Sequence, residues 1–168
     1  MEKLKIVGGN KLSGSISCSG AKNAALPMLA ATILSDQPIT FKNLPYLQDI
    51  TTMFEILGSM GADITLNESM DFIISTSKLH DFEARYELVK TMRASILVLG
   101  SLVARHGFAR IALPGGCAIG TRPVDFHLDA LEKLGAKIEL KNGYIEASAK
   151  KLIGCEINFP GVSVTGTE

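Results

Sequence analysis

An internal repeat limits the folds that are open to this chain. A shift of 69 positions places similar residues on one another, namely Ala25 on Ala94, Ile33 on Leu102, Leu34 on Val103, Leu44 on Leu113 and Pro45 on Pro114. Both copies begin with a helix rich in small residues, followed by a polar break, a short strand and a Leu-Pro pair. The chain is therefore expected to be built from two related units.

The second half of each copy follows the same order. A second amphipathic helix, 47–60 or 124–134, ends at Gly-Ala, and glycine is typical of the position just beyond a helix. The hairpin strands expected after these helices span 63–66, 72–75, 137–140 and 144–147. The pattern predicts an α/β (α+β) protein made of repeated βαβαββ units.

The repeat also divides the chain. We expect the first unit to span 20–88 and the second unit 89–161. Residues 162–168 are similar to the entry to the first helix, so a third unit is expected to begin there. Residues 1–19 have a strand pattern. We therefore expect the chain to be the N-terminal part of a longer protein.

The two copies differ by five residues added between Pro114 and Gly135, since the shift is 69 at Leu-Pro and 74 at Gly-Ala. The added residues belong to the loop 113–123, Leu-Pro-Gly-Gly-Cys-Ala-Ile-Gly-Thr-Arg-Pro. This loop holds Cys117 close to Arg122, and nearby positive charge favours the reactive thiolate. We expect Cys117 to be the most reactive thiol, as nucleophile or proton donor. A tolerated surface loop is the alternative.

The other two cysteines have a different setting. Cys18 and Cys155 lie in strand-like runs, 15–19 and 155–159, and are expected to be structural. An odd number of cysteines without CxxC spacing argues against a disulfide framework and a zinc site.

A cation stands near the start of the first helix of each copy, Lys22 in one and Arg93 in the other. The helix dipole is positive there, so two cations at equivalent positions favour a bound anion such as a phosphate or carboxylate. Solvated side chains are the alternative. Asp125 lies where a helix begins, and a carboxylate is ordinary at that position.

Charge and hydropathy exclude some classes of protein. The 17 basic and 17 acidic side chains cancel, so no nucleic-acid footprint is expected. The longest uncharged apolar segments, 24–34 and 94–104, are shorter than the roughly 20 residues that span a bilayer. We expect a cytoplasmic protein that does not bind membranes.

Three segments together, 19–27, 88–95 and 113–125, resemble the UDP-N-acetylglucosamine 1-carboxyvinyltransferases. The Pro-Gly-Gly-Cys loop is specific to these enzymes, since the related shikimate-pathway transferases lack it. The resemblance extends along the whole chain but implies only about the first two-fifths of a family member. It implies the enolpyruvyl transferase fold, an inside-out α/β barrel of repeated units, which is incomplete in this chain. It also implies that the strands of residues 1–19 complete the sheet of the other domain.

The resemblance also implies an activity. Members transfer the enolpyruvyl group of phosphoenolpyruvate to the 3-hydroxyl of UDP-N-acetylglucosamine and release phosphate, the first committed step of peptidoglycan precursor synthesis. No metal or cofactor is implied.

The resemblance assigns roles to individual residues. Lys22, Arg122 and Cys117 are implied to be catalytic, with Cys117 as proton donor and site of a covalent phosphoenolpyruvate adduct. Lys22 and Arg122 are also implied to bind substrate. The other implied substrate-binding residues are Asn23, Arg93, Pro123, Val124, Asp125, Phe126, Ser163 and Val164.

Part of the family's machinery is expected to lie outside this chain. The carboxylate that accepts the sugar hydroxyl proton belongs to the C-terminal portion of the family, which is therefore the expected partner of this chain. Alone, the chain is expected to be inactive. The alternative is a truncated relative that binds nucleotide sugar without turnover.

Overall fold

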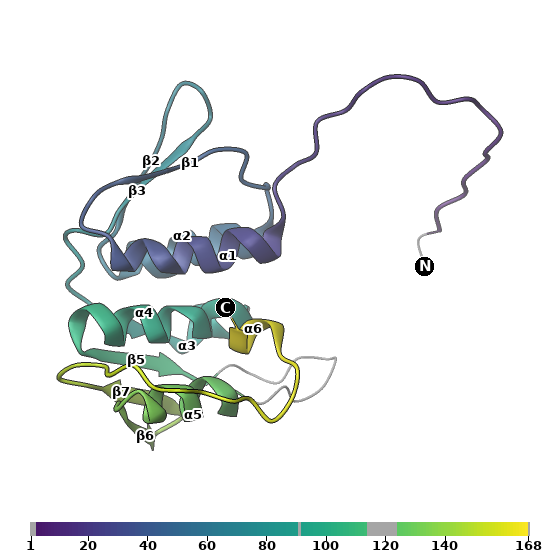
Figure 1. Ribbon diagram of the computed structural model, residues 1–168. Helices are drawn as coiled ribbons and strands as arrows, with labels where there is room; N and C mark the ends of the chain where they lie inside the picture. Colours follow the sequence, from purple (N-terminus) through teal and green to yellow (C-terminus); the bar gives the residue numbers. More distant parts are fainter. Residues whose placement is uncertain (1–2, 91, 114–123, 168) are drawn as a thin grey trace.

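The computed structural model describes residues 3–90, 92–113 and 124–167, and it places helices between two sheets (Figure 1). The first unit contains α1 (Lys22–Ala31), the short 3-10 helix η1 (Thr32–Leu34), β1 (Ile39–Phe41), α2 (Gln48–Ser59), β2 (Asp63–Leu66) and β3 (Phe72–Ser75). Two elements at the end of the expected first unit follow, β4 (Glu83–Ala84) and α3 (Tyr86–Val89), and β4 joins the sheet of the second unit. The second unit contains η2 (Arg93–Ile96), α4 (Leu97–His106), β5 (Phe108–Ala112), α5 (Asp125–Lys133), β6 (Lys137–Lys141) and β7 (Tyr144–Ser148). The helix α6 (Val164–Thr167) follows.

The two sheets have the same core topology, which confirms the repeat. The first sheet has the order β1-β3-β2, and the second has the equivalent order β5-β7-β6 with β4 added in parallel beside β5. All other pairings are antiparallel. The four predicted hairpin strands are present, each within a residue of its expected end.

Glycine ends the second helix of each unit, as the pattern predicts. Gly61 and Gly135 follow α2 and α5 with φ of 103° and 98°, values that favour glycine. In the β6–β7 hairpin, Asn142 and Gly143 both have positive φ, as a type I′ turn requires.

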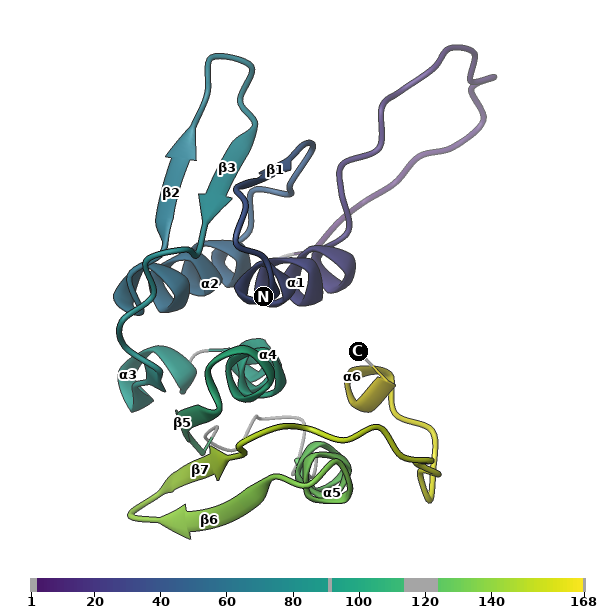
Figure 2. The same cartoon turned by 60° about the vertical axis from the view of Figure 1, so that its left-hand side comes forward.

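The core lies between the sheets, where α1 and α4 meet (Figure 2). Small residues such as Ala25 and Ala30 let these helices approach closely, and both are almost fully buried. Ile33 and Leu102, which the repeat makes equivalent, are both fully buried. Deep burial at both positions indicates that the repeat reflects the packing of the core.

Arg105, near the end of α4, joins the second unit to the first. Its guanidinium donates to the carbonyls of Ile33 at 2.6 Å and Ser35 at 2.7 Å, and to Thr76 Oγ1 at 3.2 Å. It also pairs with the carboxylate of Asp36. Because only 17% of its side chain is exposed, Arg105 satisfies polar atoms that have little access to water.

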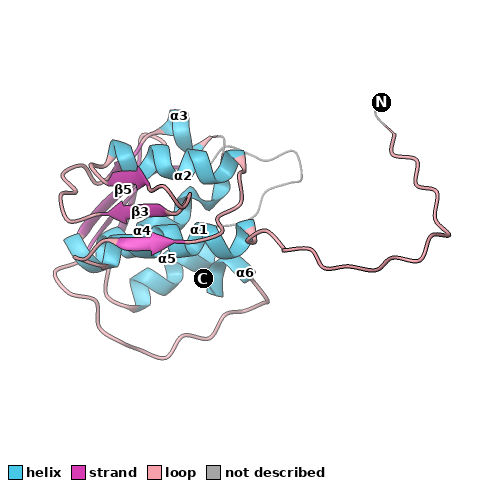
Figure 3. Ribbon diagram, turned by 90° about the horizontal axis from the view of Figure 1, so that it is seen from above, coloured by secondary structure: helices cyan, strands magenta, loops and turns pink. Residues whose placement is uncertain are grey.

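The described residues 3–19 form no strand within this chain, and their completion of another domain's sheet stays a prediction. The described residues before α1 are extended, without sheet partners, and run away from the helices and sheets (Figure 3). Ile16 is 93% exposed. A strand needs a neighbour to satisfy its backbone groups, so the alternating pattern alone does not produce one here.

None of the described helices has the length and apolar character needed to cross a membrane.

Candidate functional site

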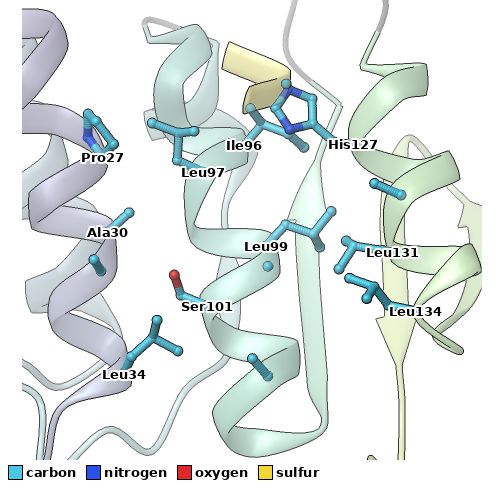
Figure 4. Close-up of a pocket in the computed structure, with 15 residues that line it drawn as sticks. Pro27, Ala30, Leu34, Ile96, Leu97, Leu99, Ser101, His127, Leu131 and Leu134 are labelled. Carbon is cyan, nitrogen blue, oxygen red and sulfur yellow. The ribbon is translucent and has the colours of Figure 1, made fainter. Parts of the chain in front are cut away.

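The helices α1, α4 and α5 lie side by side and begin at the same end of the molecule (Figures 1 and 4). The repeat produces this arrangement, because it gives the units the same order of helix and strand. Lys22 and Asn23 open α1, Arg93 opens η2 just before α4, and Asp125 opens α5. The start of α6 lies at this end as well. The structure therefore gathers the described candidate residues at one end, which we call the helix-entry end.

Lys22 has a partner that the sequence reasoning missed. Its Nζ donates to Oδ2 of Asp49 at 2.7 Å, and Asp49 lies in the first turn of α2. The side chains are 44% and 32% exposed, so the pair remains accessible to water. In this structure the negative charge beside Lys22 is therefore the carboxylate of Asp49, which belongs to the chain itself.

The entry to α1 is braced against the entry to α2. Asn43, which precedes α2 with φ of 56°, donates from Nδ2 to the carbonyl oxygen of Cys18 at 3.2 Å. Gly20 lies against the same residue, and a Cβ added there would stand 2.2 Å from the Asn43 carbonyl oxygen. Only glycine allows so close an approach without a shift in the backbone.

Replacing Gly20 by alanine is therefore expected to reduce the free energy of unfolding by about 1–3 kcal/mol, since the added methyl overpacks a backbone contact. Urea denaturation of the chain measures this loss. The matched control is Gly58→Ala, in an open, exposed position within α2, where alanine is expected to stabilise the helix. Equal effects of the two substitutions would contradict the close approach at Gly20.

Ser163, a predicted binding residue beyond the second unit, lies near Phe126 at the start of α5. The Phe126 ring stacks on Phe159 with centroids 5.5 Å apart, and the Cβ position of Gly166 lies 3.6 Å from Phe126 Cβ. Ser163 Oγ accepts from the Gly166 N–H at 3.0 Å. The structure thus brings Phe126 and Ser163 into one neighbourhood, although they are far apart in sequence.

The remaining predicted site residues differ in how exposed they are and in whether the structure describes them. Val124 is half-buried against the core, while Asn23 and Val164 are exposed. Cys117, Arg122 and Pro123 lie outside the described residues, as does the side chain of Arg93. Their assigned roles stay predictions.

The structural reading of the other two cysteines is wrong. Cys18 and Cys155 are exposed free thiols, and neither lies in a strand. Cys155 makes a 3.3 Å contact from Sγ to the Lys133 carbonyl oxygen. The predicted reactivity of Cys117 therefore rests on the charge of Arg122 and not on burial of the competing thiols.

A mainly apolar groove of about 370 Å³ runs over α4 between α1 and α5 (Figure 4). Pro27, Ala30 and Leu34 line one side of it, and Leu131 and Leu134 line the other. Among the described residues that line it there is no lysine or arginine, so an anion site is expected at the helix-entry end and not in the groove. Within the described part of the chain, no group of three His, Cys, Asp or Glu side chains could hold a metal ion.

Two histidines resist protonation. Burial lowers the pKa of His127, which lines the groove. Burial, assisted by the charge of Arg105, lowers the pKa of His106, whose ring stacks on Phe82 at 4.5 Å between centroids. Among the described atoms, no hydrogen-bond partner exists for the buried His106 Nε2.

Stability is therefore expected to fall as the pH is lowered through about 6.5, where the unfolded histidines take up protons that the folded chain resists. Urea denaturation between pH 7.5 and pH 5 measures this slope. Replacing His106 by phenylalanine is expected to reduce the slope, whereas His80→Gln, at an exposed position, controls for loss of a histidine. An unchanged slope in His106→Phe would contradict the assignment.

Comparison with known proteins places these observations in a family. Residues 6–168 match the family model described as EPSP synthase (3-phosphoshikimate 1-carboxyvinyltransferase). The chain is 56% identical over 168 residues to the UDP-N-acetylglucosamine 1-carboxyvinyltransferase of Halorhodospira halophila, and 56% identical over 169 residues to that of Coxiella burnetii. The whole chain is covered, but it spans only 40% and 39% of those relatives.

Solved structures give the same picture. The chain is similar to the enolpyruvyl transferase NikO from Streptomyces tendae, with a TM-score of 0.72 and 27% identity over 89% of this chain and 33% of that one. The fold also matches EPSP synthase from Acinetobacter baumannii, with a TM-score of 0.68, at 15% identity over 91% of this chain and 36% of that one.

Proposed function

The chain belongs to the EPSP synthase family, and on this basis we propose that its full-length protein transfers an enolpyruvyl group from phosphoenolpyruvate to UDP-N-acetylglucosamine. The acceptor is the 3-hydroxyl of the sugar, and phosphate is released. The observation that carries this proposal is the 56% identity, along the whole chain, to relatives named for the same transfer. We further propose that this reaction supplies peptidoglycan precursors in the cytoplasm.

Phosphoenolpyruvate carries a phosphate and a carboxylate, so it needs converging cations. Lys22 at the start of α1 is one such cation in our proposal, and Arg122 is the other. The exposure of the Lys22 side chain supports this role, because an incoming anion has access to it.

Cys117 would supply the proton for the addition step. The sugar oxygen bonds to the central carbon of phosphoenolpyruvate, and the methylene carbon takes the thiol proton and becomes a methyl group. The thiolate then takes a proton back from that methyl group, and release of phosphate restores the double bond. The base that accepts the 3-hydroxyl proton belongs, in this proposal, to a part of the protein beyond these 168 residues.

The nucleotide sugar would bind along the helix-entry end. Asn23 and Arg93 lie at the starts of neighbouring helices, and the segment 123–126 leads into α5. The proximity of Ser163 and Phe126 supports a shared binding surface that includes Val164.

The proposal is tested by measuring phosphate release with both substrates, in the full-length protein and in the 168-residue chain. We expect turnover only at full length, because substrate positioning can supply roughly 7–11 kcal/mol and this chain lacks the proposed base. Binding of UDP-N-acetylglucosamine by the full-length protein without phosphate release would instead favour the nucleotide-sugar-binding alternative. Turnover by the chain alone within tenfold of full length would show that the base has been misplaced.

The role of Cys117 has its own test. Limiting maleimide, followed by peptide mapping, is expected to modify Cys117 before the exposed Cys18 and Cys155. Preferential labelling of either exposed cysteine would contradict the predicted thiolate character.

A further inference from the structure

We infer that Asp49 is a positioning residue that holds the ammonium of Lys22 at the helix-entry end, ready for the phosphate or carboxylate group of the substrate. This inference rests on the proposed function and extends it to a residue in the first turn of α2. The Asp49 carboxylate acts through Lys22 and does not itself contact the substrate.

The ion pair connects two points that are fixed independently. In α1 the residues that follow Lys22 are anchored by Ala25 and Leu26, which are 2% and 4% exposed. In α2 the residue after Asp49, Ile50, is 3% exposed. The two backbones therefore cannot drift apart, and the 2.7 Å contact between their side chains sets the direction of the lysine.

The surrounding loop strengthens this geometry. The Asn43 amide bonds the Cys18 carbonyl oxygen, and Gly20 packs on the Asn43 carbonyl oxygen. Together with Lys22–Asp49, these contacts make three links between the entry to α1 and the entry to α2. These contacts fix the two helix starts relative to each other. Such close positioning is more than an ion pair would need if it only stabilised the fold.

The chemistry of the ammonium lets both partners bind at once. A lysine has three N–H donors, and Asp49 uses one of them, so two remain for an anionic ligand. A free lysine side chain has large rotamer entropy, which is lost when it is fixed on a ligand. Asp49 reduces that loss, because it holds the side chain in place before the ligand arrives.

A double-mutant cycle on the full-length protein tests the inference. Asp49→Asn is expected to raise the KM for phosphoenolpyruvate and to lower kcat/KM about tenfold, while Asp49→Glu restores part of the loss. In a Lys22→Ala background, Asp49→Asn is expected to change kcat/KM less than twofold. A role confined to stabilising α2 would produce the same loss in both backgrounds and would overturn the inference. Asp63→Asn, at an exposed position in β2, is the matched control.

A second measurement does not depend on turnover. Lysine side-chain NMR of the ¹⁵N-labelled protein is expected to show a larger change at Lys22 than at any other lysine on Asp49→Asn. An unchanged Lys22 signal would overturn the inference even if the enzyme is active. Absence of phosphate release by the wild-type protein would count against the proposed function, and the NMR result would still decide whether Asp49 holds Lys22.

Discussion

Alanine at Lys22 or at Arg122 is expected to lower kcat/KM of the full-length protein by a factor on the order of 10² or more. In the proposed function each substitution removes a charge-assisted contact to an anionic substrate, which costs about 2–4 kcal/mol and more where charge develops in the transition state. Lys22 is accessible at the start of α1, and its neighbour Asp49 would then be left without its cation.

Steady-state phosphate release, with each substrate varied in turn, measures this effect. Lys150→Ala is the control, because Lys150 is exposed beyond β7 and away from the helix-entry end. Near-normal kinetics in either variant would remove that residue from the site. Normal kcat with only a modest rise in KM would place it at the rim of the site.

Alanine at Arg105 is expected to reduce the free energy of unfolding by about 2–4 kcal/mol. The substitution strands the carbonyl oxygen of Ile33, leaves that of Ser35 with only the 3.2 Å bond from Thr76 Oγ1, and removes one partner of Thr76. These atoms are poorly placed to recruit water, because the Arg105 side chain is only 17% exposed.

Urea denaturation of the 168-residue chain measures this loss. Asp36→Asn is the control, since it removes the charge of a carboxylate that is 84% exposed and is expected to cost less than about 1 kcal/mol. Similar losses in both variants would mean that the ion pair, and not the bonds to Ile33 and Ser35, holds the units together.

Local pattern was enough to predict the hairpins and the helices that precede them. In β2 and β3, alternation and a turn sequence agree, and the strands pair with each other, so no distant partner is needed. The runs 15–19 and 155–159 also alternate, but no described strand pairs with them. Alternation indicates which face of a strand is apolar and does not supply its neighbour.

Asp49 shows why the site was harder to predict than the fold. An aspartate in the first turn of a helix is fully explained by the helix dipole, so nothing local points to a second role. Its contact with Lys22 joins residues 27 positions apart. The sequence did offer one indication of this contact. Lys22 is a cation at the start of α1, where the helix dipole is already positive, so a negative partner was to be expected.

The contact between Arg105 and Asp36 joins positions 69 apart, which is the spacing of the repeat itself. The repeat therefore places an arginine and an aspartate at equivalent positions of the two units, and these two equivalents meet. Identical units would carry the same charge at both positions, and the two like charges would repel. The contact between the units thus depends on a difference between the copies, and not only on what they share.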